Sequence, residues 1–284
     1  MIIAKKMKTI RHLITLAAAF TISAGMLTIH AQENNQADKF VPEVGQQGKD
    51  VVWVPTPQEL VNKMLEIGKV TADDYVIDLG SGDGRTVISA AKIGAKAVGI
   101  EYNPDMVVLS KENAKKEGVG DKTEFLQADL YETDLSKATV ITMFLLPEIN
   151  LKLRPRLLDL KPGTRIVSNT FTMGEWEADM EVTTEENWNS WNTAYLWIIP
   201  AKVGGKWKLG DGELELVQEY QFVRGTFKAG IRSQSVTDGR LEGNTFSFKI
   251  NDDTYTGVVS DLMIKGTATN KAEGKTWDWT ASRQ

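Results

Sequence analysis

The sequence predicts an α/β protein, with a doubly wound, mainly parallel sheet followed by a small antiparallel all-β domain. Between residues 51 and 200, short apolar runs rich in β-branched residues alternate with amphipathic segments of helical period, which is typical of strands joined by helical crossovers. A glycine-dense turn at residues 80–84 connects one of these runs to a helix-like segment. From residue 201 onwards, apolar residues recur at every second position, as in antiparallel strands with one buried face.

The composition fits a soluble globular protein and excludes several kinds of catalysis. Of the 284 residues, 42% are hydrophobic, 25% are charged and none is cysteine. Both histidines, His12 and His30, fall within the first 31 residues. The rest of the chain therefore lacks a histidine base for serine or cysteine catalysis and the ligands of the usual zinc sites, and we expect no metal. The net charge of −5 argues against nucleic acid as a partner, because polyanions are held mainly by basic residues.

The N-terminus has the pattern of a secretory signal peptide over residues 1–31. Four basic residues precede an apolar run from Leu13 to Leu27, and the small residue Ala31 follows at a suitable cleavage point. We expect an exported protein, periplasmic or secreted; the alternative is an uncleaved leader that anchors the chain in the membrane. Residues 32–50 are polar and lack apolar periodicity, so they predict a flexible leader.

A strand, a tight turn and a helix are predicted around the glycine-dense segment. Tyr75 to Leu79 is apolar and β-branched, and a helix-like run follows the turn. Glycines suit such a turn because it needs unusual φ and ψ angles and because a ligand must approach the backbone closely, with the helix N-terminus directed at it. The next predicted strand ends in Glu101, 23 positions after Asp78. An acidic residue at this spacing meets a ribose diol in nucleotide-binding βαβ units, so the segment predicts a nucleoside-cofactor site.

The spacing of the glycines distinguishes between cofactors. A dinucleotide fingerprint, G-x-G-x-x-G, requires a third glycine at position 85, which is Arg85, and this weakens the nicotinamide alternative. The motif is instead Asp78-x-Gly80-x-Gly82-x-Gly84, and it resembles motif I of the class I S-adenosylmethionine-dependent methyltransferases. The resemblance implies a Rossmann-like methyltransferase sheet that binds S-adenosylmethionine, and Asp78 suits the ammonium group of that cofactor.

The same resemblance implies roles for the end of the third predicted strand, residues 123–130. In the class, the acidic residue at this point holds the adenine amino group and the next residue covers the ring, roles that fall on Asp129 and Leu130. The predicted cofactor-binding residues are Asp78, Gly80, Ser81, Gly82, Gly84, Glu101, Tyr102, Asp129 and Leu130.

Two segments flank the predicted cofactor site. Thr56, Pro57 and Glu59 have the spacing of a helix-opening capping box, and the residues just before it, 53–56, are either part of a lid on the cleft or a purely structural entry to the helix. At the other side, the apolar strand 138–146 is followed by Pro147 and Glu148. Glu148 is the candidate catalytic residue, since its carboxylate can accept a hydrogen bond from an amine; the alternative is a helix N-terminal Glu favoured by the helix dipole.

A narrower resemblance extends over residues 51–200. Residues 54–70, 76–104 and 144–176, with the blocks PTP and LLPE, are similar to the family of the mitochondrial lysine methyltransferases of the ATP synthase c-subunit and the adenine nucleotide translocase, and to its bacterial relatives. The resemblance implies an N-methyltransferase whose acceptor is a protein lysine; a small-molecule acceptor stays open. Since an exported protein meets little S-adenosylmethionine, the alternative is a non-catalytic, methyltransferase-like binding module of the cell envelope.

The remaining aromatic residues and the C-terminal strands carry no assigned chemistry. Trp176, Trp188 and Trp191 either line a substrate cleft or belong to the core. Residues 201–284 predict an antiparallel sheet or small barrel with turns at 211–212, 238–239 and 251–253, and one continuous strand over 241–250. This part resembles a β extension behind some bacterial members of the class, and substrate docking, ligand binding and dimerisation stay open as its role.

Overall fold

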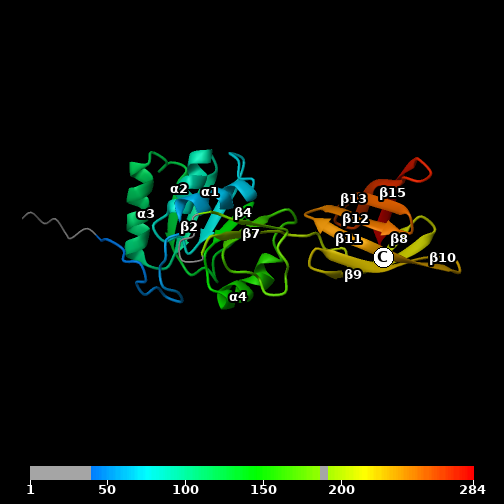
Figure 1. The fold of residues 1–284 in the computed structure, drawn as a ribbon, viewed down its shortest axis with the longest axis horizontal. Coiled ribbons are helices and arrows are strands. Elements are labelled where there is room, and N and C mark those ends of the chain that lie inside the picture. The colour runs from blue at the N-terminus through cyan, green and yellow to red at the C-terminus, as the bar shows by residue number, and fades with distance from the viewer. Residues whose placement is uncertain (1–39, 186–190) are drawn as a thin grey trace, which may run out of the picture. The chain divides into compact units, whose positions relative to one another are not determined.

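The computed structural model describes residues 40–185 and 191–284 (Figure 1). The predicted signal peptide, the first part of the predicted leader and Trp188 lie outside the described residues. The described chain contains a helix-flanked sheet and a closed barrel, so the predicted fold class is confirmed.

The sheet has the strand order β3-β2-β1-β4-β5-β7-β6. Strands β1 to β5 are parallel, whereas β7 pairs antiparallel with both β5 and β6. The order reverses between β1 and β4, which lie side by side, and such a switch point is where open α/β sheets bind ligands. The strands are β1 (Tyr75–Leu79), β2 (Lys96–Glu101), β3 (Thr123–Gln127), β4 (Val140–Met143), β5 (Arg165–Asn169), β6 (Met180–Thr183) and β7 (Thr193–Ile198).

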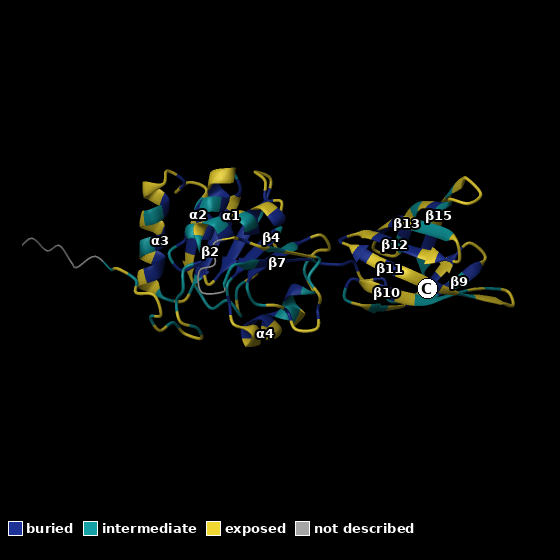
Figure 2. Ribbon diagram, in the orientation of Figure 1, coloured by how far each residue is buried: buried dark blue, intermediate teal, exposed yellow. Residues whose placement is uncertain are grey.

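Helices cover both faces of this sheet, because alternate residues of each parallel strand point to opposite sides. One apolar cluster joins one face to α1 (Gln58–Ile67), α2 (Arg85–Ile93) and α3 (Pro104–Lys116). Another joins the opposite face to α4 (Pro147–Leu157) and also contains Trp176 and Trp197. Figure 2 shows the buried strands between the partly exposed helices. Trp176 is therefore a core residue.

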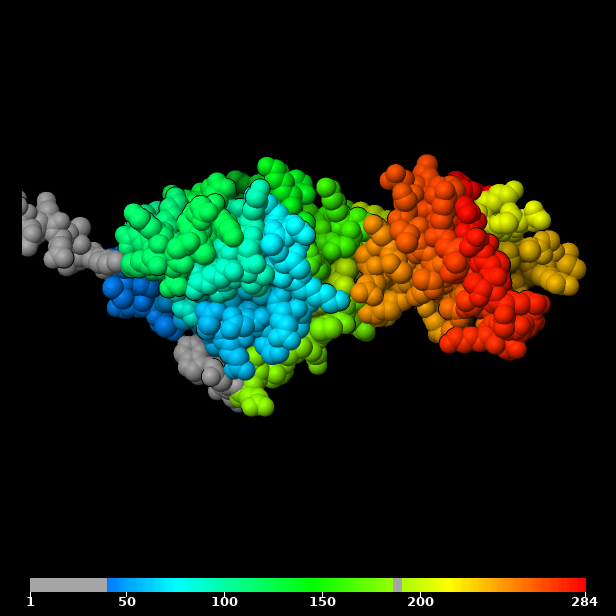
Figure 3. All heavy atoms as spheres, turned by 90° about the horizontal axis from the view of Figure 1, so that it is seen from above, coloured from blue at the N-terminus to red at the C-terminus, as the bar shows by residue number. Residues whose placement is uncertain are grey.

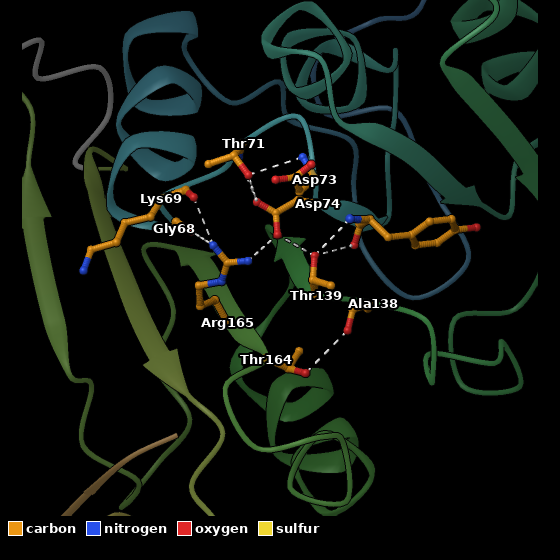
Figure 4. Close-up of polar contacts among 10 residues, drawn as sticks. Gly68, Lys69, Thr71, Asp73, Asp74, Ala138, Thr139, Thr164 and Arg165 are labelled. Carbon is orange, nitrogen blue, oxygen red and sulfur yellow. Dashed lines mark hydrogen bonds and ion pairs between the residues drawn. The ribbon is translucent and has the colours of Figure 1, made fainter. Parts of the chain in front are cut away.

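A buried polar network fixes the amino end of β1 (Figure 4). Asp74 accepts hydrogen bonds from the Thr139 hydroxyl, at 2.7 Å, and from the Thr71 N–H, at 2.8 Å, and forms an ion pair with Arg165. Arg165 also donates to the Gly68 carbonyl at the end of α1. Burial alone raises the pKa of Asp74, but the hydrogen bonds from Thr139, Thr71 and Arg165 outweigh it, so the net pKa lies below its ordinary value. The network ties β1, β4, β5 and α1 together at the end of the sheet opposite the glycine turn.

The C-terminal part is a closed eight-stranded barrel with the order β10-β11-β12-β13-β14-β15-β8-β9. Its interior is filled by alternate apolar residues, among them Trp207, Phe246, Phe248 and Trp279. The strands are β8 (Gly205–Leu209), β9 (Gly212–Glu219), β10 (Phe222–Ala229), β11 (Arg232–Glu242), β12 (Thr245–Ile250), β13 (Asp253–Ser260), β14 (Met263–Asn270) and β15 (Lys275–Arg283).

Two local predictions for the barrel are wrong. Asp238 and Gly239 do not form a turn but lie inside β11, where the pairing with β12 is irregular between Thr237 and Arg240. Gly239 is needed there because a Cβ at this position would lie 2.1 Å from the Val223 carbonyl oxygen of the neighbouring strand. The predicted single strand over 241–250 is interrupted by a turn at residues 243–244. The Asp-Gly pair at 238–239 thus marks a strand irregularity rather than a turn, and the actual turn lies at residues 243–244, inside a stretch that the alternating pattern predicted as one strand.

Candidate functional site

A cavity of about 370 Å³ opens at the carboxyl ends of the five parallel strands. Each strand contributes a residue at or just beyond its end. Asp78 comes from β1, Glu101 from β2, Asp129 from β3, Phe144 from β4 and Phe171 from β5. These strand ends meet at one edge because the strands are parallel, so residues far apart in the sequence line one space.

Asp78 is a buried carboxylate that faces the cavity. It is only 5% exposed, and its Oδ1 accepts a hydrogen bond from the Thr142 hydroxyl at 2.6 Å. The pKa of Asp78 is raised to about 7, mainly by burial; the nearby carboxylates of Glu101 and Asp83 contribute to the rise, and the Thr142 hydrogen bond opposes it. A carboxylate in this position is stabilised in its charged form by a cation in the cavity.

The glycine turn divides into a cavity-lining part and a packing part. Gly80, Ser81 and Gly82 line the cavity, whereas Gly84 does not. Gly84 has φ +83° at the start of α2, and a Cβ there would lie 2.8 Å from the Phe125 ring. The Ser81 hydroxyl oxygen is buried without a hydrogen-bond partner in the described part of the chain, and it lies against β2, where a Cβ on Gly99 would come within 2.6 Å of it. Gly84 thus supports the turn by packing rather than by lining the cavity.

Glu101 is held rigidly beside the turn. Its Oε2 accepts from the Gly82 N–H and its Oε1 from the Asn103 N–H, both at 2.9 Å. A carboxylate has further lone pairs, so both oxygens can still accept hydrogen bonds from a hydroxyl pair. Tyr102 lies next to it, 52% exposed at the rim of the cavity.

Asp129 is paired with Lys49, a residue that no sequence motif marks. Lys49 Nζ lies 2.6 Å from Asp129 Oδ2 and 4.8 Å from the centre of the Tyr102 ring. The Lys49 hydrogen bond lowers the pKa of Asp129, and the Tyr131 N–H lowers it further. Leu130 lines the cavity beside this pair. Only the position of Lys49 within a polar segment was visible in the sequence, and polarity alone does not indicate a contact 80 residues away.

Lys49 belongs to an N-terminal hairpin, residues 45–53, that covers one side of the cavity. Gln47 and Val52 form an antiparallel bridge, and the Gly48 N–H donates to the Val51 carbonyl at 2.9 Å. Trp53 lies so close to the glycine turn that a Cβ on Gly82 would come within 2.5 Å of its Nε1. Figure 3 shows residues of this segment, in blue, on the surface beside the cyan and green residues of the sheet part. The described part of the predicted leader, residues 40–50, is therefore packed against the site.

Arg85 fastens the hairpin's C-terminal continuation to the glycine turn. Its Nη1 donates to the Thr56 carbonyl at 2.8 Å, and its Nη2 lies 2.6 Å from Asp83 Oδ2. The predicted capping box is wrong, since α1 begins after Pro57 without a side-chain cap. The buried Thr56 hydroxyl instead accepts from Asn169 Nδ2 at 3.2 Å. The residues that resembled a helix signal therefore join the hairpin to β5.

Glu148 lies apart from these groups. It is exposed in the first turn of α4 and does not line the cavity. Three aromatic residues that do line the cavity, near the ends of β4 and β5, are Phe144, Phe171 and Trp191. Of these, only Trp191 was among the aromatic residues considered from the sequence. The catalytic role of Glu148 stays a prediction.

Comparison with known proteins places this geometry in a family. The ANTKMT methyltransferase domain matches residues 78–180. A protein-lysine N-methyltransferase of Saccharolobus islandicus is 45% identical over 152 residues, which cover 52% of this chain and 94% of the relative. The chain belongs to this family of S-adenosylmethionine-dependent methyltransferases.

Further relatives agree with the assignment. A crystal structure from Salinibacter ruber, described as an RNA methyltransferase in complex with S-adenosyl-L-homocysteine, is 50% identical, covers 53% of this chain and 96% of its own, and has a TM-score of 0.50. The human lysine N-methyltransferase of the ATP synthase c-subunit is 34% identical over 141 residues. The match covers 49% of this chain and 54% of the human relative. Membership of this family shows that the protein is an enzyme, and the alternative of a non-catalytic binding module is not supported.

The cavity fits S-adenosylmethionine on its own residues. The buried Asp78 favours a cation such as the cofactor's ammonium group, the glycine turn allows a ligand to approach the backbone closely, and Glu101 can accept from a ribose diol. Within residues 40–185 and 191–284, no group of three potential metal ligands gathers, and no helix is both long and apolar enough to span a membrane.

Proposed function

We propose that this methyltransferase modifies the side-chain amine of lysine in a protein. The observation that carries the proposal is the 45% identity to the archaeal protein-lysine N-methyltransferase, which extends over almost all of that relative. The geometry supports it, because the cavity continues beyond the carboxylates of β1, β2 and β3 to the ends of β4 and β5, which leaves space for an acceptor beside the cofactor.

The chain's own residues act by binding and orientation. Asp78 would hold the ammonium group of S-adenosylmethionine and Glu101 its ribose hydroxyls, and Asp129 with Leu130 would hold the adenine, the last two as the resemblance implies. When bound, S-adenosylmethionine would supply an electrophilic methyl group: the lysine ammonium first loses a proton to solvent, the neutral amine forms the N–C bond as the S–C bond breaks, and the positive charge passes from sulfur to the methylated nitrogen. The protein's contribution is to keep the amine within near-attack distance of the methyl group in a cavity that excludes water. This positioning removes a large part of the activation barrier of a bimolecular transfer.

A second candidate acceptor is RNA, because the similar Salinibacter protein is described as an RNA methyltransferase. The charge of this chain disfavours it. Residues 40–284 carry 28 Lys and Arg against 36 Asp and Glu, a net charge of −8. Nucleic acid binding draws most of its affinity from basic residues that neutralise phosphates.

The two acceptors are distinguished by one labelling experiment. The full chain is incubated with methyl-labelled S-adenosylmethionine and either a lysine-containing peptide mixture or total RNA, with Asp78→Ala and Glu101→Ala as controls. Label recovered as methyl-lysine after acid hydrolysis, and lost in both variants, supports the proposal. Label found in nucleosides and not in lysine contradicts it.

We also propose that residues 1–31 direct export, with an uncleaved membrane anchor as the alternative. The basic residues, the apolar run and Ala31 support this proposal. An alkaline phosphatase fusion at Gln32 tests it, since the reporter is active only after export. An inactive but intact fusion contradicts export.

A further inference from the structure

The carboxyl edge of the sheet divides the cavity into two halves of different chemistry. Along the strand order β3, β2, β1, the cavity is lined by the carboxylates Asp129, Glu101 and Asp78. Along β4 and β5, it is lined by Phe144 and Phe171. Neighbouring strands are spaced about 4.8 Å apart, so the halves are adjacent rather than superimposed. A cofactor held by the carboxylates therefore leaves the aromatic half to the acceptor.

The aromatic half is a continuous wall formed from three separate segments. Phe144 follows β4, Phe171 follows β5 and Trp191 precedes β7. The Phe144 and Phe171 ring centres are 5.9 Å apart with an interplanar angle of 21°, and Trp191 meets Phe144 edge-on at 5.8 Å. All three side chains are partly exposed, and each lines the cavity. Their remaining ring surface is thus available to a ligand.

We propose that Phe144, Phe171 and Trp191 form the acceptor site and bind the alkyl stem and cationic head of a lysine side chain against their ring faces. This proposal rests on the proposed lysine reaction and assigns the residues that recognise the acceptor. Aromatic rings attract an ammonium through their negative faces, and they also cover a methylene chain without requiring a hydrogen bond. A methylated ammonium keeps both interactions, so substrate and product are held by the same wall.

The geometry of the wall favours an alkylammonium over a nucleobase. A base inserted between two rings requires about 7 Å between them, at an optimal separation of about 3.5 Å on each side. Phe144 and Phe171 are only 5.9 Å apart and already contact each other, so they cannot sandwich a base. The acidic net charge of residues 40–284 also disfavours a polyanion.

The test measures the preference of the wall for a cation. The full chain, saturated with S-adenosylhomocysteine, is titrated with a capped trimethyl-lysine and with its neutral carbon isostere, using ligand-observed NMR. We expect the cation to bind about tenfold more tightly. Phe144→Leu and Phe171→Leu reduce this preference to about twofold or less, whereas Phe222→Leu, the same exchange on a barrel strand outside the cavity, leaves it unchanged.

Methyl transfer to a lysine peptide is measured in parallel. We expect the two wall variants to raise the KM for peptide about tenfold while the Kd of S-adenosylhomocysteine stays within twofold, which also shows that the variants are folded. Equal binding of cation and isostere by the wild type, or unchanged peptide kinetics in both wall variants, overturns the acceptor site. If the wild type prefers the cation but transfers no methyl group to lysine, the proposed lysine reaction fails and the binding wall stands.

Discussion

Replacing Asp78 with Asn separates the stability of the empty protein from its affinity for the cofactor. The carboxylate is buried and has a pKa of about 7, mainly because burial penalises its charged form. Asn retains an oxygen that accepts from the Thr142 hydroxyl, which lies 2.6 Å from Asp78 Oδ1. The substitution therefore removes the buried charge with little change of shape. We expect Asp78→Asn to be more stable than the wild type and unable to bind the cofactor tightly.

The size of the effect follows from the pKa. A rise from an ordinary 3.8 to about 7 corresponds to about 4 kcal/mol of folding free energy that the ionised carboxylate costs. Because the folded-state pKa is raised, this cost is absent below about pH 4, grows as the pH increases, and is complete above pH 7. The variant should exceed the wild type by a few kcal/mol at pH 8.5 and match it at pH 4.

Urea denaturation of both proteins without cofactor, at pH 4 and pH 8.5, measures the difference directly. Asp74→Asn is the matched control, since the net pKa of Asp74 is lowered and its carboxylate contributes stability above pH 4 that is lost as the pH falls. This variant should be less stable than the wild type at pH 8.5. If Asp78→Asn is no more stable than the wild type at pH 8.5, the reasoning about the buried charge is refuted.

The pH dependence of cofactor binding also tests the ionisation of Asp78. A cationic ligand favours ionised Asp78, so below pH 7 the wild type must release a proton when S-adenosylmethionine binds. The Kd for S-adenosylmethionine should rise about tenfold as the pH falls from 6.5 to 5.5, and calorimetry in two buffers should detect proton release. Asp78→Asn should bind weakly and lose this pH dependence.

Three further substitutions test the surroundings of the site. Lys49→Gln breaks the ion pair with Asp129 and should accelerate S-adenosylhomocysteine dissociation roughly twofold to fivefold, measured by stopped-flow fluorescence; an unchanged rate means that the hairpin does not retain the cofactor. Arg85→Lys keeps the charge but cannot bind Asp83 and the Thr56 carbonyl together, and should lose about 1 kcal/mol in urea denaturation, against no loss if these bonds are unimportant. Glu148→Gln should leave kcat within twofold because the side chain lies outside the cavity, and a loss of more than tenfold establishes it as catalytic.

The cofactor half of the cavity was predictable because its signals are local. Asp78, the alternating glycines and Glu101 lie on consecutive strands and turns, and the chemistry of a nucleoside ligand fixes their spacing. The structure places all predicted cofactor-binding residues around the cavity except Gly84, which packs against Phe125. A sequence motif alone does not distinguish a glycine that makes room for a ligand from one that makes room for a neighbouring side chain, because both requirements select glycine.

The acceptor half was not predictable because no local pattern marks it. Phe144 and Phe171 stand at the ends of apolar strands, where an aromatic residue is also an ordinary core residue, and only the parallel pairing of β4 with β5 brings them together. Lys49 was missed for a related reason, since polar composition predicts a flexible leader wherever no apolar face is present. Contacts over 80 residues depend on the fold, not on composition.

The two halves of the cavity also differ in what they cost the folded protein. Asp78 is destabilising until a cation reaches it, because Thr142 offers it only a neutral hydroxyl, whereas the cofactor offers a positive charge. The rings of Phe144 and Phe171 already stabilise each other, so the acceptor half costs little when empty. The chemistry of one ligand, the cofactor, thus determines the residues of the charged half, and this half therefore carries the recognisable motif. The acceptor half needs only aromatic surface, which different residues can supply, and so a motif of this class identifies the cofactor more readily than the acceptor.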